Sequence, residues 1–248
     1  MFRPKVAHKG DLATASRRFV LFVEGPRDRD VLRLFAQKLS PELARAMDSC
    51  VRILGGRQPD RAAELFGQMV EQAARNNGEP PKGLCILDRD DPDRLGSVYP
   101  KNFDPEASEL EFVIWKRRQI ESYLLVPRAI GRCLARHGNH HQLDHLLEAW
   151  LPDPSDENEF RSLNAKQVLG ARGPIASYLG RPLRAQEIVR GMTPLEIHDD
   201  IKAVLAHVRD RLGSPVQPAV RSAGLRGCAV EGLLRNPSLT SVGKTENC

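Results

Sequence analysis

The chain has 248 residues, of which 41% are hydrophobic, 28% charged and 5% aromatic, and its formal net charge is +5. This length allows one or two domains with a full hydrophobic core, and the composition is that of a globular protein. No stretch approaches ~18 uninterrupted apolar residues, which argues against a transmembrane helix and a membrane partner. The basic N-terminus lacks the apolar region of a secretory signal, and the five cysteines are scattered singly. We therefore expect a cytoplasmic protein without disulfides.

The first half of the chain alternates short apolar runs with segments of helical periodicity. Continuous apolar runs predict four strands, at residues 19–23, 50–54, 83–87 and 110–115. Helices are expected from residue 28 to about 39, from 59 to about 74, and around 120–125. Strands that alternate with helices in this way indicate an α/β fold with a four-stranded, mainly parallel sheet.

The second half of the chain shows helical spacing only. We expect helices at residues 128–137, 141–151, 157–170 and 194–212. The organisation we predict is a flexible leader (1–17), an α/β core (18–126), a helical extension (127–212) and a disordered tail (213–248).

Acidic residues follow three of the four predicted strands. Glu24 follows the first strand, Asp88 and Asp90 follow the third, and Glu121 lies in the helix after the fourth; Asp28 is one helical turn beyond Glu24. The carboxyl ends of parallel strands meet at one edge of a sheet, where ligands bind in such folds. Crowded carboxylates raise one another's pKa unless a cation neutralises them. Oxygen ligands of this kind suit Mg²⁺ or Mn²⁺.

Some of these carboxylates also have a purely structural explanation. Asp28 can cap the helix that begins near it, and Asp90 and Asp91 before Pro92 can form an ordinary turn. Glu24 is harder to explain in this way, because a carboxylate beside a buried strand needs a partner. The joint placement at three strand ends favours a metal site.

These residues resemble a Toprim domain, the metal-dependent catalytic module of topoisomerases, primases and several nucleases. Its hallmarks are a glutamate after the first strand, here Val23-Glu24-Gly25, and an Asp-x-Asp after the third, here Asp88-Arg89-Asp90. Residues 23–32 resemble the E-G-x-x-D-x-x-x-L form found in overcoming-lysogenization-defect (OLD) family nucleases. Residues 118–125 resemble that group's R-x-I-E-N-Y-L element, with Ser122 in place of asparagine.

The resemblance covers residues 18–126 well and extends weakly to about Leu212. It implies a Toprim-like Rossmannoid core followed by a helical C-terminal region. It also implies roles for five acidic residues: Glu24 as metal ligand or general acid/base, Asp88 and Asp90 as metal ligands, Asp28 as support for the first metal site, and Glu121 as completion of the second.

Other candidate site residues are basic or glycine. In OLD-type nucleases a lysine from the downstream helical region assists phosphate chemistry, and Lys166 is the candidate here, although it also fits a solvated helix position. Arg117 and Arg118 either contact phosphate or belong to a solvated helix start. Gly55 and Gly56 would let the backbone come close to the site or to a phosphate.

Two further patterns bear on cofactors and partners. Full-length OLD nucleases carry an ATPase domain ahead of the Toprim domain, but no G-x-x-x-x-G-K-[ST] occurs in this chain. The chain therefore works alone, as a monomer or homodimer, or with a separately encoded ATPase. His141 and His145 have zinc-like spacing, but no H-E-x-x-H is present and we prefer a polar loop that enters a helix.

The sequence thus predicts a Mg²⁺- or Mn²⁺-dependent nuclease that cleaves phosphodiester bonds by two-metal chemistry. We expect the nucleic acid to be DNA rather than RNA, and a role in phage defence or DNA repair. The alternative is a non-catalytic Toprim effector or binding module that works with a separate ATPase. A topoisomerase-like strand transferase ranks last, because it needs a catalytic tyrosine in a further domain.

Overall fold

The computed structural model describes residues 19–89, 100, 103–104, 106, 108–135 and 140–213. All of them belong to one compact unit of the chain, Met1–Ser214. The expected leader, nearly all of the expected tail, Asp90 and the side chain of His141 lie outside the described residues.

Four parallel strands form one sheet, with the order β2-β1-β3-β4. The strands are β1 (Phe19–Val23), β2 (Val51–Ile53), β3 (Lys82–Leu87) and β4 (Leu110–Ile114). Leu21 of β1 lies opposite Val51 on one side and Leu84 on the other. All five residues of β1 are buried, since this strand lies inside the sheet. The expected four-stranded parallel sheet is confirmed.

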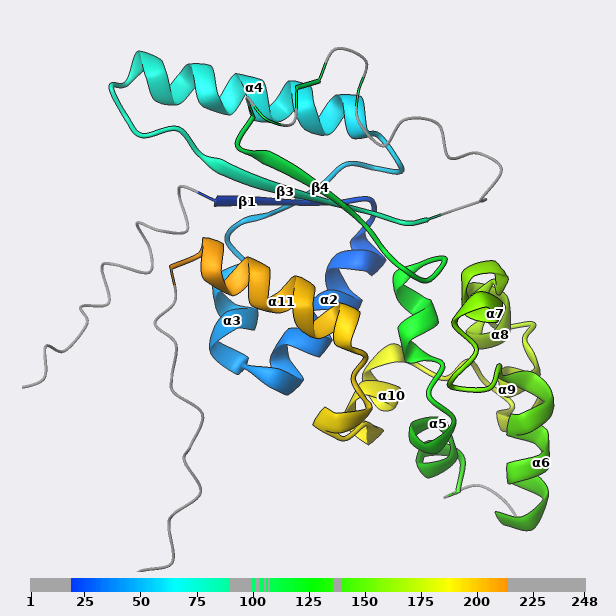
Figure 1. The fold of residues 1–248 in the computed structure, drawn as a ribbon. Coiled ribbons are helices and arrows are strands. Elements are labelled where there is room, and N and C mark those ends of the chain that lie inside the picture. The colour runs from blue at the N-terminus through cyan, green and yellow to red at the C-terminus, as the bar shows by residue number, and fades with distance from the viewer. Residues whose placement is uncertain are drawn as a thin grey trace, which may run out of the picture. The chain divides into compact units, whose positions relative to one another are not determined.

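Helices cover both faces of the sheet. Helix α4 (Pro59–Arg75) lies over one face, and α2 (Pro26–Leu39), α3 (Pro41–Met47) and α11 (Asp199–Arg211) lie over the other (Figure 1). Because side chains alternate along a strand, β1 contributes to two separate cores. Phe22 packs in the α4-side core, and Leu21 packs in the α2-side core.

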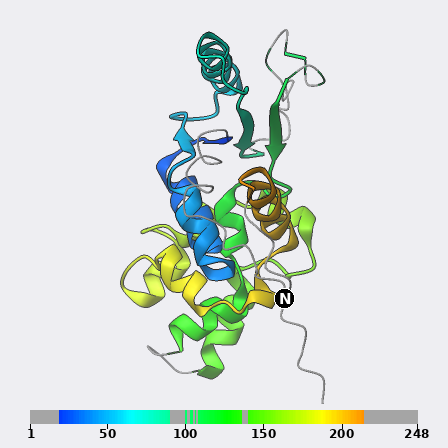
Figure 2. The ribbon, with the colours of Figure 1, turned by 90° about the vertical axis from the view of Figure 1, so that its left-hand side faces the viewer.

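The helical C-terminal part is also confirmed, with some differences in detail. After the 3₁₀ turn η2 (Ile120–Leu124), the elements are α5 (Pro127–Leu134), α6 (His140–Trp150), α7 (Glu157–Ser162), α8 (Ala165–Leu169), α9 (Pro174–Leu179), α10 (Ala185–Gly191), η3 (Pro194–Glu196) and α11. The helix expected at 157–170 is two helices, because Leu163 is extended (φ −66°, ψ 129°). Helix α10 contacts both α2 and α5, and so ties the helical part to the first helix after β1 (Figure 2).

None of the helices in the described part of the chain has both the length and the apolar character needed to cross a bilayer.

Candidate acidic site at the sheet edge

Glu24 and Asp88 lie side by side at the carboxyl edge of the sheet. They follow β1 and β3, which are neighbouring parallel strands. The backbone N–H of Asp88 donates a hydrogen bond to Glu24 Oε1 at 2.8 Å. The register of two strands 64 residues apart therefore brings together the first pair of predicted acidic residues.

Gly55 and Gly56 hold the main chain at Glu24. Both have positive φ values, 87° and 132°, which favour glycine. Both backbone N–H groups donate to the Glu24 carbonyl oxygen at 2.9 Å. The two glycines fix the backbone beside the site. Their N–H groups are not available to a phosphate, because both are bonded to Glu24.

The Gly56→Ala variant should lose about 1–3 kcal/mol of unfolding free energy, since a side chain at φ 132° is strained. Urea unfolding measures this. Gly67→Ala is the matched control: a Cβ at this position of α4 meets nothing within 4 Å, so the change should be neutral or stabilising. Equal stability of Gly56→Ala and the parent protein would contradict the strain argument.

Asp28 serves as a cap and as a neighbour of the acidic residues. Its Oδ2 accepts a hydrogen bond from the Gly25 N–H at 2.8 Å, at the start of α2. Burial raises the pKa of Asp28, while nearby Lys166 opposes the rise. The structural role that the sequence allowed for Asp28 is present, and so is its proximity to the other carboxylates.

Asp88 is the most strongly perturbed acidic residue of the site. It is 5% exposed, and its Oδ1 accepts a hydrogen bond from the Ile120 N–H at 3.3 Å. Burial raises the pKa of Asp88 to about 8, with further increases from Asp28 and Glu24. Even with the Lys166 ammonium nearby, this carboxyl is therefore protonated for much of the time at neutral pH in the metal-free protein.

Glu121 is buried without hydrogen bonds to its carboxylate. It is 1% exposed, and within the described part of the chain neither side-chain oxygen has a hydrogen-bond partner. Arg27 Nε lies 2.9 Å from Oε1, an ion pair in which the two groups are not aligned for a hydrogen bond. Burial raises the pKa of Glu121, against the attraction of Lys166. A buried carboxylate in this state has unused capacity to bind a cation.

Lys166 joins the cluster from the helical part. Its Nζ lies 3.7 Å from Asp88 Oδ2 and 3.7 Å from Glu121 Oε2. Burial lowers the pKa of Lys166, but the attraction of Glu121, Asp88 and Asp28 outweighs it and leaves the pKa above its ordinary value. The two carboxylates thus share one ammonium group. Lys166 is therefore not simply a solvated lysine on the surface of a helix. From here on, "acidic site" means Glu24, Asp28, Asp88, Glu121 and Lys166.

Gln119 is a residue that the sequence reasoning missed. It is 6% exposed, and its side-chain oxygen, oriented by its partners, accepts hydrogen bonds from Ala165 N at 2.9 Å and Lys166 N at 3.0 Å. It thereby caps the first turn of α8. No local pattern marks such a contact, because Gln119 and Lys166 are far apart in sequence.

The free energy of unfolding of the Gln119→Met variant should be about 1 kcal/mol lower than that of the parent protein, because α8 loses this cap. Thermal melting measures this loss. Gln167→Met is the matched control, since Gln167 is an exposed residue of α8. If the two variants melt at the same temperature, Gln119 does not support α8.

Arg117 and Arg118 differ sharply in their surroundings. The Arg117 side chain is 6% exposed, stacks 3.6 Å above the centre of the Phe160 ring and pairs with Glu157. The Arg117 guanidinium is therefore enclosed by protein and is not available to a phosphate. Arg118 is partly exposed, and its Nη1 donates to the Ser162 carbonyl at 2.8 Å.

The 3₁₀ turn that carries Glu121 is held by the last helix. The Tyr123 hydroxyl donates to Asp200 of α11 and accepts a hydrogen bond from the Arg117 N–H at 3.2 Å. Asp200 also accepts from the Lys116 N–H at 3.1 Å. The helical extension thus fixes the turn that places Glu121.

The donor set of the acidic site matches a hard divalent cation in chemistry. The atoms that could bind the cation are carboxylate oxygens, which Mg²⁺ and Mn²⁺ prefer. Those of Glu121 accept no hydrogen bond in the described part of the chain. Among the described residues, no three His, Cys, Asp or Glu side chains are arranged closely enough to hold an ion as they stand. Asp90, which the sequence places in this set, lies outside those residues. His145 is exposed, and its Nδ1 lies 3.6 Å from Glu148 Oε2.

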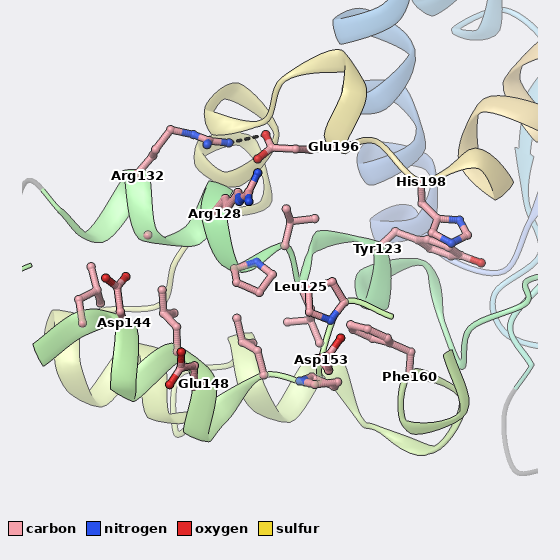
Figure 3. A pocket seen from close by; sticks show the side chains of 18 of the residues that line it. Tyr123, Leu125, Arg128, Arg132, Asp144, Glu148, Asp153, Phe160, Glu196 and His198 are labelled. Carbon is pink, nitrogen blue, oxygen red and sulfur yellow. Dashed lines mark hydrogen bonds and ion pairs between the residues drawn. The ribbon is translucent and has the colours of Figure 1, made fainter. Parts of the chain in front are cut away.

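A cavity of about 1240 Å³ lies elsewhere, among α5, α6 and α7. Its walls include Leu143, Leu147 and Phe160. Arg132 and Glu196, which also line it, form an ion pair (Figure 3). No member of the acidic site lines it. The acidic site and this cavity are therefore separate features.

Comparison with known proteins gives little. No protein-family model matches the chain, and neither does any curated protein. Two solved structures of the C-terminal region of the Xanthomonas campestris pv. campestris OLD protein are similar to it, at 18% and 16% identity with TM-scores of 0.42 and 0.44. Each match covers 79% of this chain and 96% of that chain. At these values the likeness assigns neither a site nor an activity to this protein.

Proposed function

We propose that this protein is a divalent-metal-dependent nuclease that hydrolyses phosphodiester bonds at the acidic site. The observation that carries the proposal is the convergence of Asp88 and Glu121, both buried, on the single ammonium group of Lys166 at the carboxyl edge of a parallel sheet. Glu24 and Asp28 border the same point. The Toprim-like motifs in the sequence point to the same chemistry.

The electrostatics of the site favour a bound cation. Burying like charges side by side costs free energy, which is expressed here as the raised pKa values of Asp28, Asp88 and Glu121. Lys166 and Arg27 together neutralise only part of this negative charge. Mg²⁺ or Mn²⁺ would neutralise the rest. Asp88, Glu121 and Glu24 would draw closer together to hold the ion, with Asp90 as a further ligand.

A metal ion bound there supplies Lewis-acid polarisation of the phosphate and a more acidic water molecule. The chain's own residues have distinct tasks. Glu24 holds the Asp88 backbone in place, and its carboxylate would accept a proton from the attacking water. Lys166 provides a positive charge that can turn from the carboxylates to a phosphate oxygen during the reaction.

The preference for DNA over RNA, the role in phage defence or DNA repair, and the cytoplasmic location remain part of the proposal. They rest on the motif resemblance and on the composition of the chain. A separate ATPase subunit and a homodimer are partners that the same resemblance suggests.

The test uses the purified full chain with supercoiled plasmid in Mn²⁺, in Mg²⁺ or in EDTA. We expect nicking or linearisation with either metal, none in EDTA, and none from the Glu24→Ala/Asp88→Ala double variant. Equal cleavage by parent and double variant would overturn the proposal. Absence of cleavage, together with co-purification of an ATPase, would favour the non-catalytic module instead.

A further inference from the structure

Three of the arginines near the acidic site donate to main-chain carbonyls and form no ion pair in the described part of the chain. Arg61 Nη1 donates to the Leu54 oxygen at 2.7 Å, and Arg89 Nε donates to the Trp115 oxygen at 3.3 Å. Arg118 Nη1 donates to the Ser162 oxygen. A guanidinium has five N–H donors in a fixed fork, so each of these groups is oriented while keeping donors for another partner.

The charges of these three arginines are not balanced by nearby acids. Within the described ranges, none of them forms an ion pair with a carboxylate, whereas Arg27 and Lys166 are both paired with Glu121. Arg61 is exposed, and Arg89 and Arg118 are partly exposed. They are therefore free to bind an anion that Arg27 and Lys166 would bind less readily.

The sheet places these arginines on opposite sides of the acidic site. Leu54 continues the pairing of β2 with β1, through a hydrogen bond to Val23 at 2.9 Å, and Trp115 continues the pairing of β4 with β3, through Leu87 at 3.1 Å. The order β2-β1-β3-β4 puts both anchors on the outer strands, with Glu24 and Asp88 between them. Three strand spacings separate the anchors by about 14 Å.

We propose that Arg61 on one side, and Arg89 with Arg118 on the other, form a phosphate track that holds one nucleic-acid strand across the carboxyl edge of the sheet. A stacked strand carries one phosphate per roughly 3.4 Å, so the anchors span about four phosphates. The bond over Asp88 then has bound phosphates on both sides. This inference rests on the proposed function and narrows its substrate to an internal bond of a polynucleotide, as opposed to a nucleotide or a terminal phosphate.

The experiment measures binding in EDTA, so that it does not depend on catalysis. A labelled single-stranded oligonucleotide is titrated with the full chain at several salt concentrations. Arg61→Gln and Arg89→Gln should each weaken binding about tenfold and lower the salt slope by about 0.7, the value for one lost phosphate contact on a single strand. A mononucleotide should not compete. With Mn²⁺, circular single-stranded DNA should be cut.

Arg75→Gln is the matched control, because Arg75 lies in the last turn of α4, pairs with Glu71 at 3.3 Å and is at the opposite end of the helix from Arg61. Arg61→Lys keeps the charge and should keep most of the salt slope, which separates a phosphate contact from a structural role of the carbonyl bond.

If Arg61→Gln and Arg89→Gln bind as tightly as Arg75→Gln while plasmid cleavage persists, the track is wrong and the nuclease proposal stands. If they bind more weakly but no metal supports cleavage, the track stands and the nuclease proposal fails.

Discussion

The Asp88→Asn variant is expected to lose metal-dependent cleavage by at least about 100-fold and yet to stabilise the metal-free protein at alkaline pH. The folded-state pKa of Asp88 is about 8, against an ordinary value of 3.8, mainly because the group is buried. The folded protein therefore binds this proton more tightly than the unfolded chain does, and stability falls as pH rises from about 4 through about 8. Asparagine has the same shape and no charge, so the Asp88→Asn variant should not lose stability over this pH range.

Thermal melting in EDTA at about pH 5 and about pH 9 measures the effect. The gain in melting temperature of Asp88→Asn should grow with pH and reach roughly 5 °C or more, since one pKa unit corresponds to about 1.4 kcal/mol. Mn²⁺ should raise the melting temperature of the parent protein but not of the variant. Asp30→Asn is the control, because Asp30 is exposed and paired with Arg29. A pH-independent destabilisation by Asp88→Asn would show that the carboxyl of Asp88 is a structural anchor.

The Lys166→Met variant should have the second-largest effect. Without the ammonium group, Asp88 and Glu121 lose the cation that they share at 3.7 Å, and their pKa values should rise further. Breaking a buried pair costs several kcal/mol, but Lys166 is 47% exposed, so we expect a loss of roughly 1–2 kcal/mol near neutral pH. Cleavage should fall about 100-fold, because the site loses a positive charge near the phosphate.

A double variant tests whether Lys166→Met loses stability because it leaves the Glu121 carboxylate without its cation. Lys166→Met combined with Glu121→Gln removes one of the two carboxylates that Lys166 neutralises, and should recover part of the lost stability but no activity. Urea unfolding and a cleavage assay measure the two quantities. Lys202→Met is the control, since Lys202 pairs only with the exposed Asp199 in the described structure. Additive losses in the double variant would mean that Lys166 and Glu121 are not coupled.

Much of the fold follows from local patterns in the sequence. The apolar run at residues 19–23 predicts a buried strand, and β1 (Phe19–Val23) has those bounds. Continuous apolar runs separated by helices lead to parallel strands, because each crossover returns the chain to the same edge. That Glu24 and Asp88 lie at the same edge follows from this topology. That they lie side by side depends on the strand order, which only the structure shows.

Boundaries that depend on distant contacts were harder to predict. The helix expected over 157–170 shows continuous apolar spacing, yet it breaks at Leu163 and resumes at Ala165. The resumed helix starts where the Gln119 amide meets its first N–H groups. The spacing of apolar residues carries no information about a partner that lies some 45 residues away.

The sequence by itself determined the α/β class, the parallel sheet and the identity of the acidic residues at the strand ends, since these depend on periodicity and on chain direction. Only the tertiary structure decided that Lys166 reaches Asp88 and Glu121, that Arg117 is enclosed by Glu157 and Phe160, and that the donors of Gly55 and Gly56 are bonded to Glu24. A side chain's charge is a property of its residue type. The partners of that charge and its burial depend on which distant segments pack against it.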